Sequence, residues 1–268
     1  MDLNLKGKIT LITGGTAGIG LATAERFALE GASLILCGRR AEKLEEAKQR
    51  IHSLVPSTKI LLVQADVTST PNVEKMVLQA DREFGRIDVL VNNAGTGIYK
   101  PFLEVTEEEV MHAMQMNFFA MFRVTQRVVP LMIRGGGGSI VNVTGTSGSS
   151  VFDAPFFSTC SGPAKAAENR FTKALSVELG PSNIRVNSVA PGRTNTPERL
   201  QLWSQEMGTG QEEAAATERH GWGKRICLPG HRWGEADEIA ALVAFVASGA
   251  CGFMTGSHLV ADGGETRD

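Results

Sequence analysis

Short apolar runs alternate with helix-like segments along the first half of the chain. Four runs are rich in β-branched residues and leucine and carry apolar side chains on both faces: 9–13, 33–37, 59–64 and 87–92. Three segments between them carry apolar side chains at helical spacing and charged side chains outside: 19–30, 41–53 and 70–84. Strands with two apolar faces belong to buried parallel sheets, so the alternation predicts βαβ units.

The second half of the chain continues this pattern with longer helices. Further strands are expected at 139–144, 184–190 and 257–264. The pattern predicts an α/β fold: a doubly wound parallel sheet flanked by helices, forming a single domain over residues 1–268. Right-handed crossovers bring the ligand crevice of such a sheet to the carboxyl ends of its strands.

One stretch, residues 193–234, is longer than an ordinary strand-to-helix connection. It contains Trp203, Trp222 and Trp233, together with Met207 and several glycines. Long loops inside compact domains usually serve as lids or binding segments. We therefore expect a substrate lid at about 193–234.

Composition narrows the class of protein. The chain has 268 residues, with 27 Lys and Arg against 29 Asp and Glu, a formal charge of −2. It lacks the basic excess of nucleic-acid-binding proteins and any apolar run of about 18 residues that could span a membrane. We expect a cytoplasmic protein with no nucleic-acid or membrane partner. The four cysteines (37, 160, 227 and 251) and the five histidines show no metal-ligand spacing, so no metal is predicted.

A glycine-rich turn follows the first predicted strand. The sequence TGGTAGIG places Gly14, Gly18 and Gly20 between that strand and the next helix. Glycines let the backbone approach a pyrophosphate, which free N–H groups at the helix N-terminus can hold. The spacing differs from G-x-G-x-x-G, and a plain tight turn is the alternative. Its place between strand and helix favours a dinucleotide site that includes Thr13, Thr16 and Ile19.

Further motifs identify the chain as a member of the short-chain dehydrogenase/reductase family, which it resembles over nearly its whole length. The matching residues appear in the family's order: Asp66 in ADVT, the segment NNAG at 92–95, Asn117, Lys165, and Pro191-Gly192 followed by Thr194 and Thr196. The resemblance implies a Rossmann-type NAD(P)-binding sheet and an oxidoreductase acting on a small molecule. It also implies a homo-oligomer, a tetramer or a dimer, built partly on the helix at 163–180.

The resemblance also assigns cofactor-binding roles. Asp66 and Val67 would lie next to the adenine, Asn93, Ala94 and Gly95 along the nucleotide, and Thr196 near the carboxamide. Lys165 would bind the nicotinamide ribose. Pro191, Gly192 and Thr194 are the remaining residues expected to contact the cofactor.

The end of the second strand indicates which dinucleotide is preferred. A ribose 2′-hydroxyl calls for an acidic residue about 20 residues after the glycine turn, and a 2′-phosphate for a basic one. The sequence CGRR has Gly38 at the acidic position, followed by Arg39 and Arg40. Arginine donors match phosphate oxygens, so NADP(H) is favoured over NAD(H). The alternative is that one arginine is only a solvated charge, and Ala17 lacks the basic residue of many NADP-type relatives.

The catalytic positions depart from the family pattern. Asn117 and Lys165 match, but Ser161 stands where the family has its tyrosine, and Gly145 where it has its serine. The adjacent hydroxyls belong to Thr144, Thr146 and Ser147. We take Asn117, Thr146, Ser161 and Lys165 as candidate catalytic residues. A positioned general acid is typically worth about 10² to 10⁴ in rate, so the source of the proton is the main open question.

Several groups are candidates for that proton. A water held by Lys165 and Asn117 ranks first, ahead of Ser161, Tyr99 in the loop after NNAG, and Cys160. The segments NVTGTSG and CSGPAKAAENRF resemble the acyl-CoA-linked enoyl and dienoyl reductases, which also lack the tyrosine. The leading hypothesis is an NADP(H)-dependent oxidoreductase of a carbonyl, an alcohol or a conjugated enoyl compound. A cofactor-binding sensor or scaffold without turnover, and a non-redox lyase or isomerase, are the alternatives.

Overall fold

The computed structural model describes residues 2–152, 157–197, 199–201, 204, 210 and 225–267. Seven strands form one parallel sheet in the order β3-β2-β1-β4-β5-β6-β9. The strands are β1 (Ile9–Thr13), β2 (Ser33–Gly38), β3 (Ile60–Gln64), β4 (Val89–Asn92), β5 (Gly138–Val143), β6 (Ile184–Pro191) and β9 (His258–Ala261). The predicted doubly wound sheet in a single domain is confirmed, and the strand order reverses between β1 and β4.

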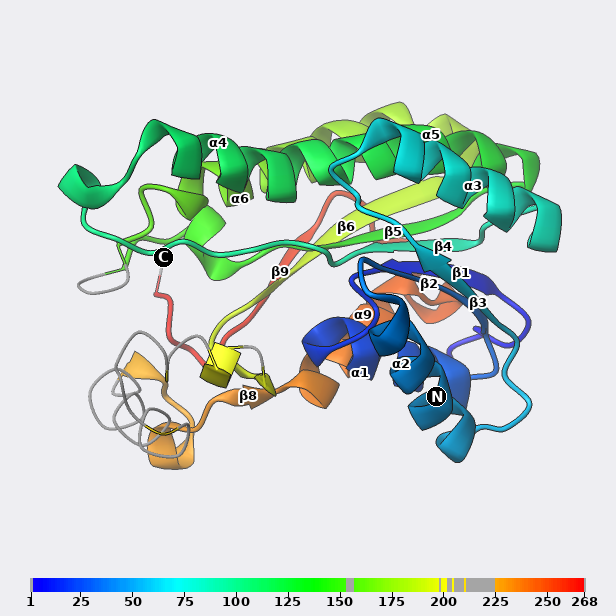
Figure 1. The fold of residues 1–268 in the computed structure, drawn as a ribbon, viewed down its shortest axis with the longest axis horizontal. Coiled ribbons are helices and arrows are strands. Elements are labelled where there is room, and N and C mark those ends of the chain that lie inside the picture. The colour runs from blue at the N-terminus through cyan, green and yellow to red at the C-terminus, as the bar shows by residue number, and fades with distance from the viewer. Residues whose placement is uncertain are drawn as a thin grey trace.

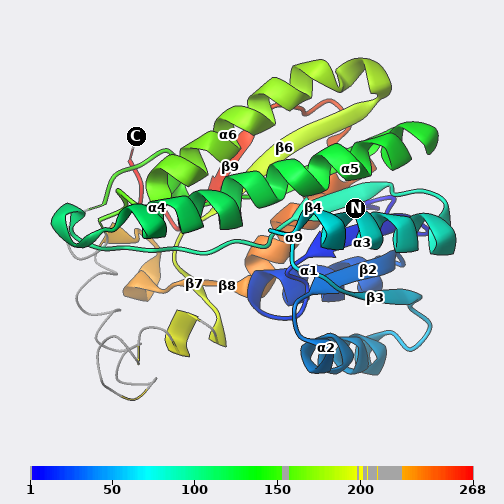
Figure 2. The ribbon, with the colours of Figure 1, turned by 45° about the horizontal axis from the view of Figure 1, so that its top comes forward.

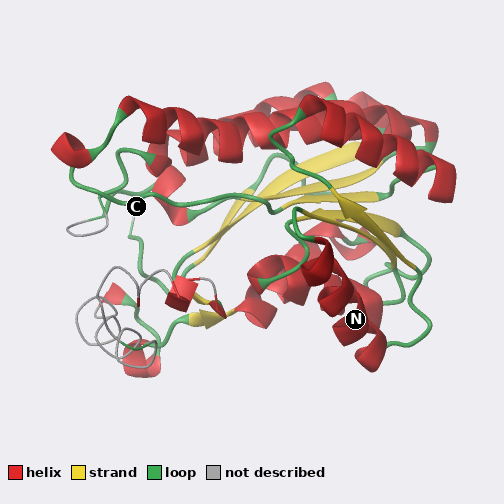
Figure 3. Cartoon of the chain, viewed as in Figure 1, coloured by secondary structure: helices red, strands yellow, loops and turns green. Residues whose placement is uncertain are grey.

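Helices cover both faces of this sheet (Figures 1 and 3). One layer contains α1 (Gly18–Leu29), α2 (Ala41–Leu54) and α9 (Ala236–Ala247), and the other contains α3 (Thr70–Phe84), α4 (Glu107–Met114), α5 (Ala120–Arg134) and α6 (Ser161–Glu178). Successive strand residues point to opposite layers, as in β1, where Ile12 packs with Phe27 of α1 and Leu11 with Val128 of α5. Two apolar cores result, one on each face, which explains the two-sided apolar strands.

Local signals in the sequence set the helix boundaries. Ser69 accepts a hydrogen bond from the Asn72 amide at the start of α3, and Gly85 ends that helix in the left-handed conformation at φ 71°. Thr106 and Glu109 form a reciprocal capping box at the start of α4. Short 3₁₀ turns occur at Phe102–Glu104, Thr146–Gly148 (η3), Gly180–Ser182, Pro229–His231 and Gly249–Cys251.

A π-helix at Gln115–Phe119 joins α4 to α5, so the two helices run as one rod across the sheet (Figure 2). Wide turns of this type lengthen the spacing between backbone hydrogen bonds and occur often at functional sites. Asn117 lies in this turn and is fully buried. The sequence predicted a helix around Asn117 but not the wider turn.

Part of the predicted lid is described. Two short strands, β7 (Thr194–Asn195) and β8 (Gly234–Glu235), pair at its two ends. Trp233 is buried, with the Arg199 guanidinium 5.4 Å from its ring centre. Trp203, Trp222 and Met207 lie outside the described residues, and the lid itself stays a prediction. Within the described part of the chain, no helix has both the length and the apolar character needed to cross a membrane.

Arg185 in β6 holds the end of α9. Its guanidinium donates to the carbonyl oxygens of Val246, Ala247, Ser248 and Met254 at 3.0 to 3.1 Å. The last carbonyls of a helix have no partner within the helix, so this one side chain satisfies groups that would otherwise lack donors.

We expect Arg185→Met to lower the free energy of unfolding by about 2–3 kcal/mol, because buried carbonyls at the end of α9 lose a charged donor. Chemical denaturation of the variant and the wild type measures the difference. Arg170→Met, an exposed change in α6, is the matched control and should lie within about 0.5 kcal/mol of the wild type. Equal stability of the two variants would contradict the role given to Arg185.

Candidate functional site

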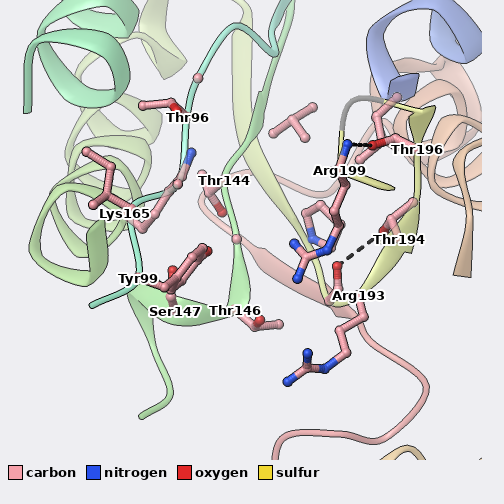
Figure 4. A pocket seen from close by; sticks show the side chains of 18 of the residues that line it. Thr96, Tyr99, Thr144, Thr146, Ser147, Lys165, Arg193, Thr194, Thr196 and Arg199 are labelled. Atoms are coloured by element: carbon pink, nitrogen blue, oxygen red, sulfur yellow. Dashed lines mark hydrogen bonds between the residues drawn. The ribbon is translucent and has the colours of Figure 1, made fainter. Parts of the chain in front are cut away.

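A cavity of about 670 Å³ opens at the carboxyl ends of the strands. Its walls come from the start of α1, the loops after β4, β5 and β6, and the first turns of α6 (Figure 4). Many predicted site residues line it together: Ile19, Asn93, Gly95, Thr146, Lys165, Pro191, Gly192, Thr194 and Thr196. The fold therefore gathers residues from five separate parts of the sequence into one space.

The glycine turn is packed so tightly that side chains are excluded. A Cβ on Gly20 would lie 2.1 Å from the carbonyl oxygen of Gly14, which itself has φ +66°. Asn93 donates from Nδ2 to the carbonyl oxygens of Thr13 and Gly14, at 3.1 and 3.2 Å. The Thr13 hydroxyl accepts from the amides of Asn93 and Ala94 at 3.0 and 3.1 Å. These bonds join β1 to β4 at the point where the strand order reverses.

The N-terminus of α1 is open to an anion. Its N-cap, Ala17, offers no side-chain hydrogen bond, and its first turn contains no acidic residue. The helices α3 and α4, by contrast, are capped by Ser69 and Thr106. Free N–H groups at a glycine-lined helix start suit a pyrophosphate, so the residues fit the dinucleotide that the motif predicts.

The β2 and β3 ends form the other side of the predicted nucleotide site. Arg39 and Arg40 are exposed beyond β2. A Cβ on Gly38 would lie 2.8 Å from Cγ2 of Thr16, so an acidic side chain has no room there without a shift. Asp66 accepts from the Thr68 amide and hydroxyl at 2.8 and 2.7 Å, and these bonds lower the pKa of its carboxyl. Val67, the next residue, is buried.

Asn117 and Lys165 converge on Gly95. A Cβ on Gly95 would lie 2.7 Å from Oδ1 of Asn117 and 3.3 Å from Nζ of Lys165, which leaves room only for glycine. Asn117 accepts from the Thr96 amide at 3.1 Å and donates to the Ala113 carbonyl at 2.8 Å. It thus fixes the loop after β4 against the π-helix, with Lys165 beside it.

Ser161 has a contact that sequence reasoning missed. Its hydroxyl accepts from the Ile98 amide at 2.6 Å and donates to the Ile98 carbonyl at 3.1 Å, and its side chain is fully buried. With its donor used in this way, the hydroxyl anchors the loop after β4 to α6. These contacts favour a positioning role, and the catalytic role expected of Ser161 stays a prediction.

Other predicted candidates differ in their access to the cavity. Thr146 and Ser147 line it at the end of β5. Tyr99 also lines the cavity. Its ring folds back on its own loop and lies so close to Gly97 that a Cβ there would be 2.7 Å from Cε2. Cys160 is fully buried, and burial raises the pKa of its thiol, which opposes a thiolate. Among the described residues no cluster of His, Cys, Asp or Glu could hold a metal ion.

Two ion pairs at the site also escaped the sequence analysis. Nζ of Lys165 lies 3.1 Å from Oε2 of Glu168, whose side chain is 1 % exposed. The spacing of three residues within a helix was a usable signal for this pair. Arg193 donates from Nε to Glu265 at 2.6 Å in the cavity wall, and both side chains are nearly buried. No sequence signal links residues 72 positions apart.

The strand order, the open glycine turn and the cavity at the strand ends define a dinucleotide-binding α/β protein. The short chain dehydrogenase family model matches residues 8–207. The chain belongs to the short-chain dehydrogenase/reductase family and is an NAD(P)-dependent oxidoreductase.

Individual relatives cover nearly the whole chain. The chain is 36% identical to a 3alpha-hydroxysteroid dehydrogenase of Mediterraneibacter gnavus, covering 98% of each. It is 32% identical to a peroxisomal 2,4-dienoyl-CoA reductase of Danio rerio, over 97% of this chain and 82% of the relative. The crystal structure of L-sorbose reductase from Gluconobacter frateurii, complexed with NADPH and L-sorbose, superposes with a TM-score of 0.92 at 29% identity over all of both chains.

We expect Ser161→Ala to loosen the loop after β4, because the amide and carbonyl of Ile98 both lose their partner. The free energy of unfolding should fall by about 1–2 kcal/mol, and exchange of the Ile98 amide hydrogen should accelerate. Amide hydrogen exchange and denaturation measure the two effects. Ser182→Ala, outside the cavity after α6, is the control; unchanged exchange at Ile98 would contradict the anchoring role.

Proposed function

We propose that the protein is an NADP(H)-dependent oxidoreductase that transfers hydride to or from a carbonyl, an alcohol or a conjugated enoyl compound. One observation carries the proposal: Lys165 lines the same cavity as the residues predicted to hold the dinucleotide, and the buried Asn117 lies beside it at Gly95. When bound, the cofactor supplies a hydride at its nicotinamide ring. The chain's own residues then have to orient the substrate and hold the proton that accompanies the hydride.

Several roles follow for the chain's residues under this proposal. The N–H groups at the start of α1 bind the pyrophosphate, and Gly14 and Gly20 allow its close approach. Lys165 holds the nicotinamide ribose and faces the substrate oxygen. Asn117 keeps the loop after β4 in place beside Lys165. Thr146 and Ser147 offer hydroxyl groups from the neighbouring turn after β5.

The proposal also covers properties of the whole protein. We include a homo-oligomer in the cytoplasm, a lid at about 193–234 and the cofactor-binding residues named above. Support for an oligomer comes from apolar side chains on the outer face of α5 and α6, where Phe122 is 39% and Val177 76% exposed. The ring of Phe122 also packs with those of Phe118 and Phe171.

The preference for NADP(H) rests on Arg39, Arg40 and the lack of an acid at Gly38. We expect Arg39→Ala/Arg40→Ala to weaken NADPH binding about 10- to 100-fold, because each charged hydrogen bond to a phosphate is worth about 1.5–3 kcal/mol. NADH binding should change less than about threefold, because NADH lacks the 2′-phosphate that the arginines would contact. Titration calorimetry measures both dissociation constants.

The matched control removes the same charge elsewhere. Arg82→Ala/Arg134→Ala lies at the far ends of α3 and α5 and should leave both dissociation constants unchanged. Equal loss of NADPH affinity in the two double variants would point to net charge alone. Tighter binding of NADH than of NADPH by the wild type would contradict the preference.

Turnover tests the proposed reaction. Purified enzyme with NADPH should consume the cofactor steadily with at least one member of a panel of cyclic ketones, sugar ketones and enoyl thioesters. Lys165→Ala should lower kcat/KM by about 10² to 10⁴, because the group nearest the substrate oxygen is removed. Lys173→Ala, on an exposed part of the same helix, is the control. Binding of NADPH without oxidation by any compound would contradict the proposal.

A further inference from the structure

Glu168 is a carboxylic acid enclosed in the fold directly behind the cavity. Its two carboxyl oxygens lie 3.3 and 3.1 Å from Nζ of Lys165, and its side chain is 1 % exposed. Lys165 lines the cavity with a side chain that is 12% exposed, whereas Glu168 is not among the lining residues. The ammonium group therefore stands between the buried carboxyl and the space for the substrate.

A contribution to the stability of the fold does not explain why a carboxyl group is buried at position 168. Its Oε2 makes no hydrogen bond of good geometry, although it is fully buried. Taking a carboxylate out of water costs several kcal/mol, and an apolar side chain of similar volume is often neutral or stabilising at such a position. Burial raises the pKa of the Glu168 carboxyl, and Lys165 offsets only part of this effect. A carboxyl with a raised pKa beside a cavity is typical of a group that handles protons.

The elements packed on α6 offer the Glu168 carboxyl no charged partner in place of Lys165. The π-helix at 115–119, η3 and the 3₁₀ turn at 180–182 carry no charged residue. On α4, Glu107, Glu108 and His112 are exposed, and Glu109 pairs with Lys100. On β6, Arg185 is held by the carbonyl groups at the end of α9. In the described part of the chain, Lys165 is the charged group that acts on the Glu168 carboxyl.

We propose that Glu168 is a positioning and proton-supplying residue that replaces the missing tyrosine indirectly, by returning a proton to Lys165 after Lys165 has protonated the substrate. This inference rests on the proposed function. Lys165 contacts the substrate and donates the proton, and Glu168 holds the proton that replaces it.

Reduction of a carbonyl compound would use two successive proton transfers, from Lys165 to the substrate and from Glu168 to Lys165. The substrate carbon receives a hydride from a reduced nicotinamide dinucleotide, and the carbon–oxygen π pair moves to the oxygen. That oxygen forms an O–H bond with a proton from Nζ of Lys165, whose N–H pair stays on nitrogen. The O–H bond of Glu168 then breaks, its proton restores the ammonium, and a carboxylate remains. Water in the cavity returns one proton to the pair through Lys165.

Other carboxyl groups at the cavity are less suited to this task. Glu109 lines the cavity, but its hydrogen bonds with Lys100 and the Thr106 amide lower the pKa of its carboxyl. Glu265 also lines it and is held by Arg193 at 2.6 Å. The hydrogen bonds to Glu109 thus favour its carboxylate form over the protonated acid. Ser161 uses its hydroxyl on Ile98. Glu168 is the carboxyl whose surroundings favour the protonated form.

The stored proton can be tested without cofactor. A carboxyl whose folded-state pKa is raised above its usual value of 4.5 stabilises the fold fully below that pH, and loses this contribution as the pH rises through the folded-state pKa. As the pH rises above about 4.5, the folding equilibrium constant of the wild type should therefore fall relative to Glu168→Gln, by up to about tenfold per pH unit, until the carboxyl of the folded protein has also ionised. Denaturation of both proteins across this range measures the ratio. A ratio that does not change with pH would overturn the proposal.

The delivery of the proton is tested by kinetics on a substrate from the panel. Glu168→Gln should lower kcat at least about tenfold, while KM and the NADPH dissociation constant stay within about twofold, because binding groups are untouched. Glu168→Asp, which keeps a dissociable proton, should recover part of kcat. Glu178→Gln, an exposed change in the same helix, should match the wild type in both experiments.

The outcomes separate this inference from the proposed function. Unchanged kcat in Glu168→Gln, or equal kcat in the Asp and Gln variants, overturns the relay even if the stability ratio depends on pH. A wild type that neither binds NADPH nor turns over a substrate refutes the proposed function instead. The cofactor-free stability ratio still decides in that case whether Glu168 holds a proton.

Discussion

The contact between Asn93 and the glycine turn is the constraint on which the site depends. Asn93 donates to the carbonyl oxygens of Thr13 and Gly14 and thereby joins β1 to β4 where the strand order reverses. Strands on the two sides of this point lead away in opposite directions, so their connecting loops part and leave a crevice. The glycine turn forms one wall of that crevice, and the loop from Asn93 to Lys100 forms another.

That second wall links the glycine turn to Asn117, Ser161 and Lys165. Asn117 fixes the loop at Thr96, and Ser161 fixes it at Ile98. Ser161, which the sequence analysis places at the position of the family tyrosine, ties the backbone of Ile98 to α6. Lys165 stays in the cavity with Glu168 directly behind it.

Relatives of this chain act on chemically different compounds, and the site suggests why one frame serves them. The residues around Gly14 and Asn93 lie at the strand ends, where the sheet fixes them, and Lys165 lies near the start of α6. The substrate side is built from loops after β4, β5 and β6, with the Arg193–Glu265 pair in its wall. Loops held by a rigid sheet can vary in sequence without disturbing the cofactor frame.

The sequence by itself determined the sheet, the glycine turn and the family, because apolar periodicity and local motifs act over short stretches of chain. The family resemblance also predicted a site formed by Asn117, Thr146, Ser161 and Lys165; Thr146 and Lys165 line the cavity, whereas Asn117 and Ser161 are buried beside it. Only the tertiary structure decided that Ser161 binds Ile98, that Arg193 meets Glu265 and that Glu168 is buried behind Lys165. The burial of Glu168 and the partners of Ser161 and Arg193 depend on segments distant in sequence, and no local pattern encodes them.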